Sequence, residues 1–249
     1  MKKALLLLLA LVLLPLGVSG AQVALTERPH WSVARSDSTA LAPDPARTPE
    51  AVIQVYAARL WGWRGALGVH SWIAFKPAGA ATYERYEVVR WSNPVVRQRQ
   101  GQPDTRWAGN EPELLLDRRG AEAARLIPQI RAAIASYPHA DEYVIWPGPN
   151  SNSFIAHIGR SVPELGLQLP PTAIGKDYLS DGALIGPPPS GTGVQVSLYG
   201  LIGAALAPRE GIELHLLGLT LGIDLLRPAL KLPGIGRVGL PAMRHVPND

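Results

Sequence analysis

The order of strand-like and helix-like segments is the feature that most constrains the fold of this chain. Strand patterns dominate residues 51–91, helical patterns dominate residues 113–162, and alternating β-like patterns return over residues 193–237. Strands followed by helices and then by further strands are typical of an α+β fold, here an antiparallel sheet with helices packed on one side. We therefore predict a single α+β domain over residues 51–249, in which the last strands complete the first sheet.

Three consecutive strands are predicted at the start of this domain. They are rich in β-branched and aromatic residues, and turn-forming residues separate them. Their predicted bounds are 51–59, 69–75 and 82–91. A hairpin centred between Ala78 and Gly79 would place Glu87 directly opposite His70 on the neighbouring strand.

Two helices are predicted after a loop at residues 92–112. Residues 113–136 carry apolar side chains at spacings of three and four, and Pro128 is expected to kink this helix or to split it. Residues 151–162 form the second predicted helix, which begins at residues that commonly cap helices. Between the two helices, residues 143–146 are predicted to form a short buried strand.

The N-terminus has the layout of a secretory signal peptide over residues 1–21. Lys2 and Lys3 precede an apolar run, and small residues follow at Val18–Ala21, where a signal peptidase could cut. We therefore predict an exported protein, periplasmic if the cell has a periplasm. The alternative is an uncleaved segment that anchors the protein to the inner membrane and gives it a membrane association.

Residues 22–50 are polar and rich in proline, without a hydrophobic period. They are predicted to form a tether, or an extended arm that lies over the domain. In a structural or assembly factor of the envelope, this arm would serve as a docking segment.

Composition excludes several classes of function. The chain has no Cys, which excludes disulfides, thiolate zinc sites, a lipid-modified cysteine and a cysteine nucleophile. Its 24 Lys and Arg nearly balance its 20 Asp and Glu, and no basic stripe suggests nucleic acid. No phosphate-binding glycine loop is present, so no cofactor is predicted. Four acidic or histidine residues late in the chain lack the spacing of a metal site, so no metal is predicted; they are Glu210, Glu213, His215 and Asp224.

The segment from Tyr143 to Ile158 carries the candidate chemistry. A strand, an abrupt turn and a helix that begins at Ser151 would expose this hydroxyl beside unpaired N–H groups. His70 on an earlier strand could act as the base and Glu87 could orient it, which satisfies the roles of a catalytic triad. The alternatives are that Ser151 only caps its helix, that His70 bonds a backbone carbonyl, and that Glu87 pairs with an arginine.

Several motifs resemble those of an uncharacterised family of exported bacterial proteins, a domain of unknown function. The resemblance covers most of residues 50–240 and implies no established activity. The motifs are His70–Lys76 (HSWIAFK), Tyr83–Trp91, Trp146–Phe154 (WPGPNSNSF), Leu169–Tyr178 and Glu210–Glu213.

A more distant resemblance is to circularly permuted papain-like proteins, the NlpC-type and lecithin–retinol-acyltransferase-like group. In that group a strand His precedes a Cys at the start of a helix, in a run like Asn-Cys-Glu-His-Phe. The run Asn150–Phe154 is similar, with Ser151 where the Cys would stand. The resemblance implies a permuted papain-like fold and catalytic roles for His70, Ser151 and Glu87. Asn150 and Asn152 of this run are assigned to substrate binding. Lys176 and Asp177, in a glycine-flanked loop, could line a substrate mouth, and the alternative for them is a surface salt bridge.

Two classes of function follow from this interpretation. The first is a hydrolase or acyltransferase that acts on an amide or ester of the envelope, with peptidoglycan or lipid as the partner. The second is a non-catalytic module that binds an envelope small molecule or assists assembly, in which Ser151 only caps its helix.

Overall fold

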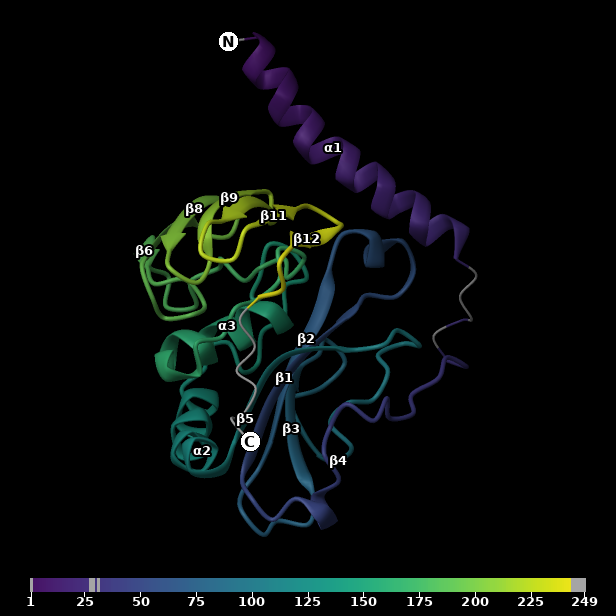
Figure 1. Cartoon of the computed structure of the whole chain (residues 1–249), viewed down its shortest axis with the longest axis vertical. Helices are drawn as coiled ribbons and strands as arrows, with labels where there is room; N and C mark the ends of the chain where they lie inside the picture. The colour runs from purple at the N-terminus through teal and green to yellow at the C-terminus, as the bar shows by residue number, and fades with distance from the viewer. Residues whose placement is uncertain (1, 27–29, 31, 243–249) are drawn as a thin grey trace.

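The computed structural model describes residues 2–26, 30 and 32–242, and these residues form an α+β fold with two antiparallel sheets. In Figure 1 the first sheet (β1–β5) fills the lower part of the molecule, and helices α2 and α3 lie beside it. The second sheet (β6–β12) lies above α3, and helix α1 extends beyond both sheets.

The first sheet has the order β4-β3-β2-β1-β5, and every pair of neighbouring strands is antiparallel. The strand order shows that β5 returns to pair with β1 at the far edge. The bounds are β1 Val52–Arg59, β2 Val69–Lys76, β3 Tyr83–Val88, β4 Val96–Gly101 and β5 Glu113–Arg119. Strands β1, β2 and β3 confirm the three predicted strands.

Two strands of this sheet were not predicted. Strand β4 lies in the predicted loop 92–112, because its polar sequence VRQRQG has no apolar alternation to reveal it. Strand β5 takes the first residues of the helix predicted over 113–136. The sequence ELLLDRR favours a helix locally, but pairing with the distant β1 overrides that preference.

Helices α2 (Gly120–Ala135) and α3 (Ser151–Ser161) confirm two helices in this part of the chain. Pro128 lies inside α2 and does not split it. Residues 143–146 form no strand, which corrects the prediction, and Ile145 and Trp146 are exposed rather than buried. The prolines that follow these residues lack the N–H groups that a strand ladder needs.

The two faces of the first sheet pack against different partners. Ile73 and Phe75 of β2 belong to one buried apolar cluster with Phe154 of α3 and Ile130 of α2. Alternate residues of β2, such as Trp72, belong to a second cluster on the opposite face. The helices therefore cover one side of this sheet, as predicted.

The register of the β2–β3 hairpin differs from the prediction by two residues. Ile73 pairs with Tyr86 and Phe75 pairs with Glu84, so the same register places Glu87 opposite Trp72 rather than His70. A shift of two residues keeps a side chain on the same face of the sheet. Glu87 and His70 consequently still share a face, as diagonal neighbours.

Part of the N-terminal arm lies on the domain. Ser38 forms an isolated bridge with Thr105. The buried carboxylate of Asp104 accepts hydrogen bonds from the backbone N–H of Leu41 (2.6 Å) and Ala42 (3.1 Å), and from the Ser38 hydroxyl (2.8 Å). The predicted arm also includes residues 27–29 and 31, which lie outside the described residues.

The second sheet has the strand order β12-β11-β10-β9-β8-β7-β6, each strand pairing with the next in sequence. The prediction of β-rich structure in this region is confirmed, but the strands form a separate sheet and do not complete the first one. The bounds are β6 Ile185–Gly186, β7 Val194–Leu198, β8 Ile202–Ala207, β9 Gly211–Leu216, β10 Leu219–Asp224, β11 Ala229–Leu232 and β12 Gly236–Gly239.

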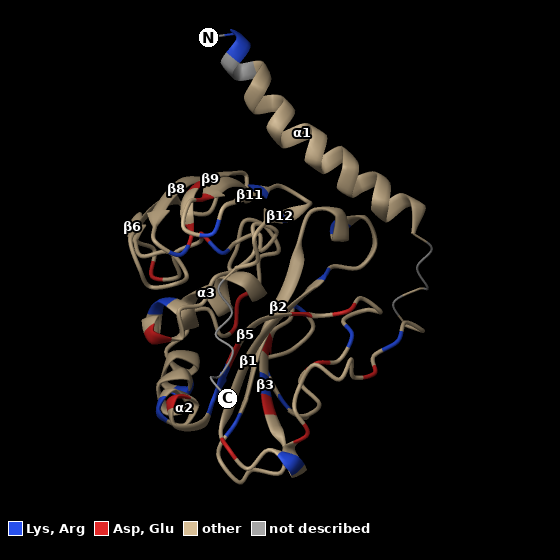
Figure 2. Ribbon diagram, in the orientation of Figure 1, with Lys and Arg blue, Asp and Glu red and all other residues tan. Residues whose placement is uncertain are grey.

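Helix α1 (Lys2–Leu25) includes an apolar stretch, Leu6–Leu25, that is long enough to cross a membrane. Such a helix fits a signal sequence or an anchor. Figure 2 shows basic residues only at its tip. Near its other end it packs on the short 3-10 helix η2 (Gly62–Ala66) and on β11. The Ser19 hydroxyl lies within hydrogen-bond distance of Ala66 O (2.8 Å) and Gly234 O (3.1 Å).

Candidate functional site

The start of α3 meets the first sheet at Ser71 of β2. The Ser71 hydroxyl donates a hydrogen bond to Asn152 Oδ1 at 2.8 Å, and it lies 3.4 Å from the backbone carbonyl of Ser151. Because successive side chains of a strand point to opposite faces, His70 points away from this junction. The position of β2 that faces the helix start is therefore a hydroxyl and not an imidazole.

Asn150 is the N-cap of α3. Its Oδ1 accepts hydrogen bonds from the backbone N–H groups of Asn152 (2.9 Å) and Ser153 (3.3 Å), and the Ser153 hydroxyl accepts one from the Asn150 N–H. These contacts form a complete capping box. The Asn150 amide also donates to two backbone carbonyls, so this predicted substrate-binding residue has internal partners.

Asn152 holds the helix start against β2. Its amide donates to the carbonyls of Val69 (3.0 Å) and Ile174 (2.9 Å), while its Oδ1 accepts from Ser71. The side chain is buried, so satisfying both of its groups is worth more than it would be in water. Asn152 thus joins α3, β2 and the segment around Ile174.

The structure does not bring Ser151 and His70 together. Ser151 is buried at the first turn of α3, on the helix-covered side of the first sheet. The His70 ring contacts Glu87, Trp72 and Trp107 on the other side. Of the three residues predicted to form a triad, only His70 and Glu87 are in contact.

His70 and Glu87 belong to a buried charged cluster. His70 Nε2 lies 2.9 Å from Glu87 Oε2, and Arg85 Nη2 donates to the same oxygen at 2.8 Å. Arg97 of β4 donates to the second oxygen, Oε1. Burial raises the pKa of Glu87, but the hydrogen bond from His70 and the nearby arginine charges outweigh it, so the pKa lies below its usual range.

Burial lowers the pKa of His70, and the hydrogen bond to Glu87 only partly offsets this effect. The ring therefore favours the neutral form, in which Nε2–H donates to the carboxylate. Aromatic rings enclose the cluster, because Trp107 stacks on His70 with 3.7 Å between ring centroids and Arg85 lies 4.2 Å above the Trp72 ring. The predicted alternative of an ion pair between Glu87 and an arginine is confirmed.

Lys176 and Asp177 do not line an open mouth. The Lys176 ammonium donates to both oxygens of Glu213, at 2.9 and 2.8 Å, and its side chain is buried. The backbone carbonyl of Asp177 accepts from Gln195 (2.8 Å), and its carboxylate lies 3.5 Å from the Ser197 hydroxyl. These residues fix the loop before β6 to the inner face of the second sheet.

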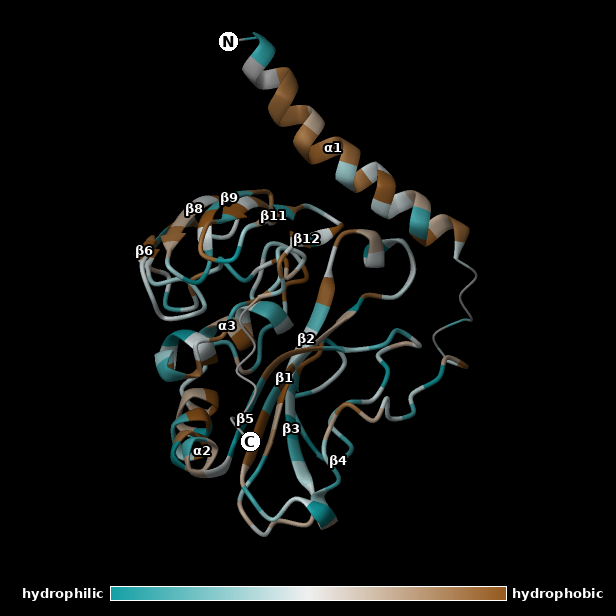
Figure 3. Cartoon of the chain, in the orientation of Figure 1, coloured by the Kyte–Doolittle hydropathy of each residue, from teal (hydrophilic) through white to brown (hydrophobic). Residues whose placement is uncertain are grey.

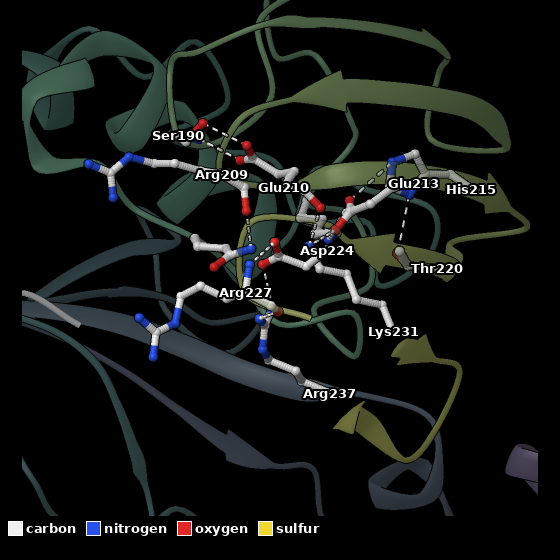
Figure 4. A network of polar contacts seen from close by, with 12 residues as sticks. Ser190, Arg209, Glu210, Glu213, His215, Thr220, Asp224, Arg227, Lys231 and Arg237 are labelled. Atoms are coloured by element: carbon white, nitrogen blue, oxygen red, sulfur yellow. Dashed lines mark hydrogen bonds and ion pairs between the residues drawn. The ribbon is translucent and has the colours of Figure 1, made fainter. Parts of the chain in front are cut away.

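The inner face of the second sheet is a polar network, shown in Figure 4. Glu213 is its centre, because Lys231 also donates to Oε1 at 2.5 Å and His215 Nε2 lies 3.6 Å from Oε2. Burial raises the pKa of Glu213, but the ammonium groups of Lys176 and Lys231 outweigh burial and hold it at about 2. Removal of any one of these three buried charges would leave a remaining charge in the interior without its partner, which is strongly destabilising.

The other residues of the metal hypothesis have separate partners. Glu210 accepts hydrogen bonds from the backbone and hydroxyl of Ser190, at 2.8 and 2.6 Å. Asp224 pairs with Arg237 at 2.9 Å. Within the described residues, no group of three or more histidine and acidic side chains is arranged to hold a metal ion.

A cavity of about 450 Å³ lies between the two sheets. Its wall includes Val69 and Leu115 from the first sheet, Leu169 from the segment after α3, and Arg237 from β12. This volume is within the usual range for small-molecule sites. Apolar and charged groups both line it, so an amphiphilic molecule would match its wall.

Sequence reasoning missed the residues that decide this geometry. Ser71 occupies the position that faces α3, and strand alternation could have indicated this once α3 was placed on one face. Arg85, Arg97 and Lys231 neutralise the buried carboxylates, but single charged residues in strands carry no motif. Trp107 covers His70 from a loop that is distant in sequence.

These observations define an α+β protein with an apolar N-terminal helix, a capped helix junction and two buried charged clusters. Residues 50–178 match a family of proteins of unknown function, DUF3750, and the chain belongs to that family. The matched residues include the first sheet, α2 and α3, and they end before β6. Neither the curated proteins nor the solved structures give a match.

Proposed function

We propose that the protein is a non-catalytic binding module of the bacterial envelope, held at the membrane by α1. The observation that carries this proposal is the hydroxyl of Ser71 at the position that faces the start of α3. Ser151 then has no imidazole to remove its proton, and a hydroxyl without a base is a weak nucleophile. In this proposal Ser151 only forms part of the first turn of α3 and takes no part in a reaction.

The buried partners of the predicted binding residues support the same conclusion. Asn150, Asn152 and Lys176 direct their polar groups to backbone carbonyls or to Glu213. Groups that are satisfied in this way would have to break internal hydrogen bonds to contact a substrate. A small lipid-like molecule of the envelope would instead enter the cavity between the sheets, where the wall is both apolar and charged.

The packing of the end of α1 supports its retention. Ser19 lies within the stretch of small residues that a signal peptidase would need, yet it is buried and bonded to the domain. These contacts with the domain require α1 to stay attached to the folded chain. With Lys2 and Lys3 on the cytoplasmic side, the domain would lie outside the cytoplasmic membrane.

Fluorophosphonate labelling of the full chain tests the absence of catalysis. We expect labelling of the parent protein to match that of Ser151→Ala, because no base activates the hydroxyl. Ser153→Ala is the matched control, since Ser153 lies in the same helix turn and belongs to the capping box. Labelling that disappears only in Ser151→Ala would instead support the Ser-His hydrolase or acyltransferase of a permuted papain-like fold.

The intact mass of protein purified from membranes tests the anchor. We expect a mass that includes residues up to Ala21, and retention of the protein in the membrane fraction after alkaline extraction. A mass that lacks these residues, with the protein in the soluble fraction, would contradict the anchor but not the non-catalytic site.

A further inference from the structure

The second sheet buries its polar side chains and exposes its apolar ones, which is the reverse of the usual arrangement in a soluble protein. In β7 and β9, Gln195, Ser197, Glu213 and His215 point inward and are buried, while the residues between them are exposed and apolar. We call the exposed side the outer face. Its residues are Val194, Val196, Leu198, Ile202, Ala204, Leu206, Ile212, Leu214, Leu216, Ile223, Leu230 and Val238. Figure 3 shows brown, hydrophobic segments in strands of the second sheet such as β8 and β9.

The apolar residues form continuous rows across the strands. Val194 pairs with Leu206, and Leu206 pairs with Ile212. The same row continues through the pairing of Ile212 with Ile223 and of Ile223 with Leu230. A continuous apolar surface of this kind on a water-exposed sheet would be an aggregation hazard, so it indicates a contact with something apolar.

Charge is absent from the exposed positions of this region. From Gly193 to Ala242, every exposed residue is Gly, Ala, Pro, Val, Ile, Leu or Tyr. The charged residues of the same stretch are buried or partly buried, many of them in the network of Figure 4. Interfaces with soluble proteins usually have a polar, charged rim, and the exposed residues from Gly193 to Ala242 carry no charge. A lipid bilayer requires no such rim.

Helix α1 gives this surface a position relative to a bilayer. The stretch Leu6–Leu25 has 20 residues, and a helix of that length spans the hydrocarbon core of about 30 Å. Ser19 lies six residues before Leu25, which corresponds to a depth of about 9 Å along the helix. Ser19 contacts Gly234 in the turn between β11 and β12, so this corner of the second sheet would lie at the same depth.

The contact between α1 and this corner is close. At Gly234, where φ is +71°, an added Cβ would lie 3.1 Å from Ser19 Cβ and 3.2 Å from Leu16 Cδ2. The helix and the sheet therefore meet without an intervening side chain from the turn. Exposed Trp63 lies on η2, which also packs on α1, and exposed aromatic residues are typical of the membrane–water boundary.

We propose that the outer face of the second sheet lies in the lipid bilayer, at the depth of the interfacial region, beside the retained helix α1. This inference rests on the proposed role of α1 as an anchor. The polar network then serves as the interior of the sheet, while lipid covers its apolar side. Burial of about 5–10 Å is the usual depth for elements that lie in the boundary without crossing it.

The absence of cysteine makes the proposal directly measurable. Single-cysteine variants of the full chain can be labelled with an environment-sensitive fluorophore and reconstituted into vesicles of phosphatidylethanolamine and phosphatidylglycerol. Val196→Cys, Leu214→Cys and Leu230→Cys place the label on the outer face. Leu11→Cys reports on α1, and Arg99→Cys on exposed β4 is the control that should remain in water.

A nitroxide-labelled phosphatidylcholine then serves as the quencher. We expect severalfold stronger quenching at the three outer-face positions than at Arg99→Cys, with Leu11→Cys quenched as well. Thermal melting of each variant in detergent checks that the fold is kept, and substitution at exposed positions should not disturb it.

The other outcomes are distinguishable. Quenching at Leu11→Cys alone would overturn the inference and leave the anchor intact. No quenching at any of these positions would overturn the anchor and the inference together. Blue-shifted emission at Leu214→Cys that the nitroxide lipid does not quench, together with crosslinking between two copies, would show that a second chain covers this face, and would also overturn the lipid contact.

Discussion

The two sheets use the same alternation of side chains in opposite ways. In the first sheet, Ile73 and Phe75 face the helices and form an apolar core, as in a protein folded in water. In the second sheet, Glu213 and Lys231 face inward, and the apolar residues face outward. The difference shows that the alternation of a strand does not decide which face is buried, because the second sheet buries its polar face.

Loss of a buried charge should affect the stability of the first sheet and of the second sheet differently. In the first sheet the cluster around Glu87 lies on the face opposite to a large apolar core, whereas the buried side chains of β9 in the second sheet are Glu213 and His215. Loss of a charge should therefore be more damaging in the second sheet. The first sheet should be more sensitive to loss of apolar volume.

The largest expected effect is that of Glu213→Gln. The substitution keeps the shape of the side chain but leaves Lys176 and Lys231 buried without a counter-charge, which costs about 3–5 kcal/mol of the free energy of unfolding. Thermal unfolding in detergent, followed by tryptophan fluorescence, measures the change. Glu142→Gln on the surface is the matched control, and an equal loss in both variants would contradict the structural role of the network.

The next comparison is between the losses of stability caused by a substitution in the apolar core and by one on the outer face of the second sheet. Ile158→Ala removes a fully buried side chain of α3 and should lower the free energy of unfolding by about 2–5 kcal/mol. Leu214→Ala, at a residue that is 53% exposed, should have much less effect in detergent. Equal losses in denaturant titrations would mean that the outer face is packed against protein.

The cap of α3 offers a smaller effect within the first region. Asn150→Ala removes the capping box and two hydrogen bonds to backbone carbonyls, so a loss of about 2 kcal/mol is expected, at the upper end for caps. Asn150→Ser restores the cap but not the other bonds, and it should recover part of the stability. If the two variants unfold at the same denaturant concentration, the cap itself contributes little.

The smallest expected effect is a dependence on pH that both regions share. Burial lowers the pKa of His70 in the first sheet and of His215 in the second. The unfolded chain takes up these protons near its ordinary pKa of about 6.5, whereas the folded chain resists them, so stability should fall as the pH drops below that value. The lowered pKa values of Glu87 and Glu213 act only below about 4.5 and do not affect this window.

The measurement is the melting temperature between neutral and mildly acidic pH. His70→Gln and His215→Gln should each flatten the dependence. A melting temperature that rises on acidification over this range would contradict the direction that burial imposes on the two rings.

The sequence predicted the local elements better than their partners. Strands β1, β2 and β3 and helix α3 were foreseen, because alternation, turn residues and the cap at Asn150 are local signals. Strand β5 was mistaken for helix, because its pairing with β1 joins residues that are distant in the chain. The contact between His70 and Glu87 was predicted in spite of a register error, since a shift of two residues preserves the face.

The orientation of the second sheet could not be read from its sequence. Alternation in Ile212–Leu216 shows which residues share a face, but it does not show which face is buried. That choice depends on Lys176 and on the surroundings of the outer face, and neither is local to the strands. The pairing of Ser71 with Asn152 was missed for the same reason, because it depends on how α3 lies against β2.

The hydroxyl of Ser19 has a consequence for how the molecule is oriented. A flexible stalk would let the domain rotate freely, but this hydroxyl lies within hydrogen-bond distance of carbonyls in η2 and in the turn between β11 and β12. If α1 spans the bilayer as proposed, the tilt of the helix and the orientation of the domain relative to the membrane are set together. Any molecule that approaches would meet the same side of the protein each time.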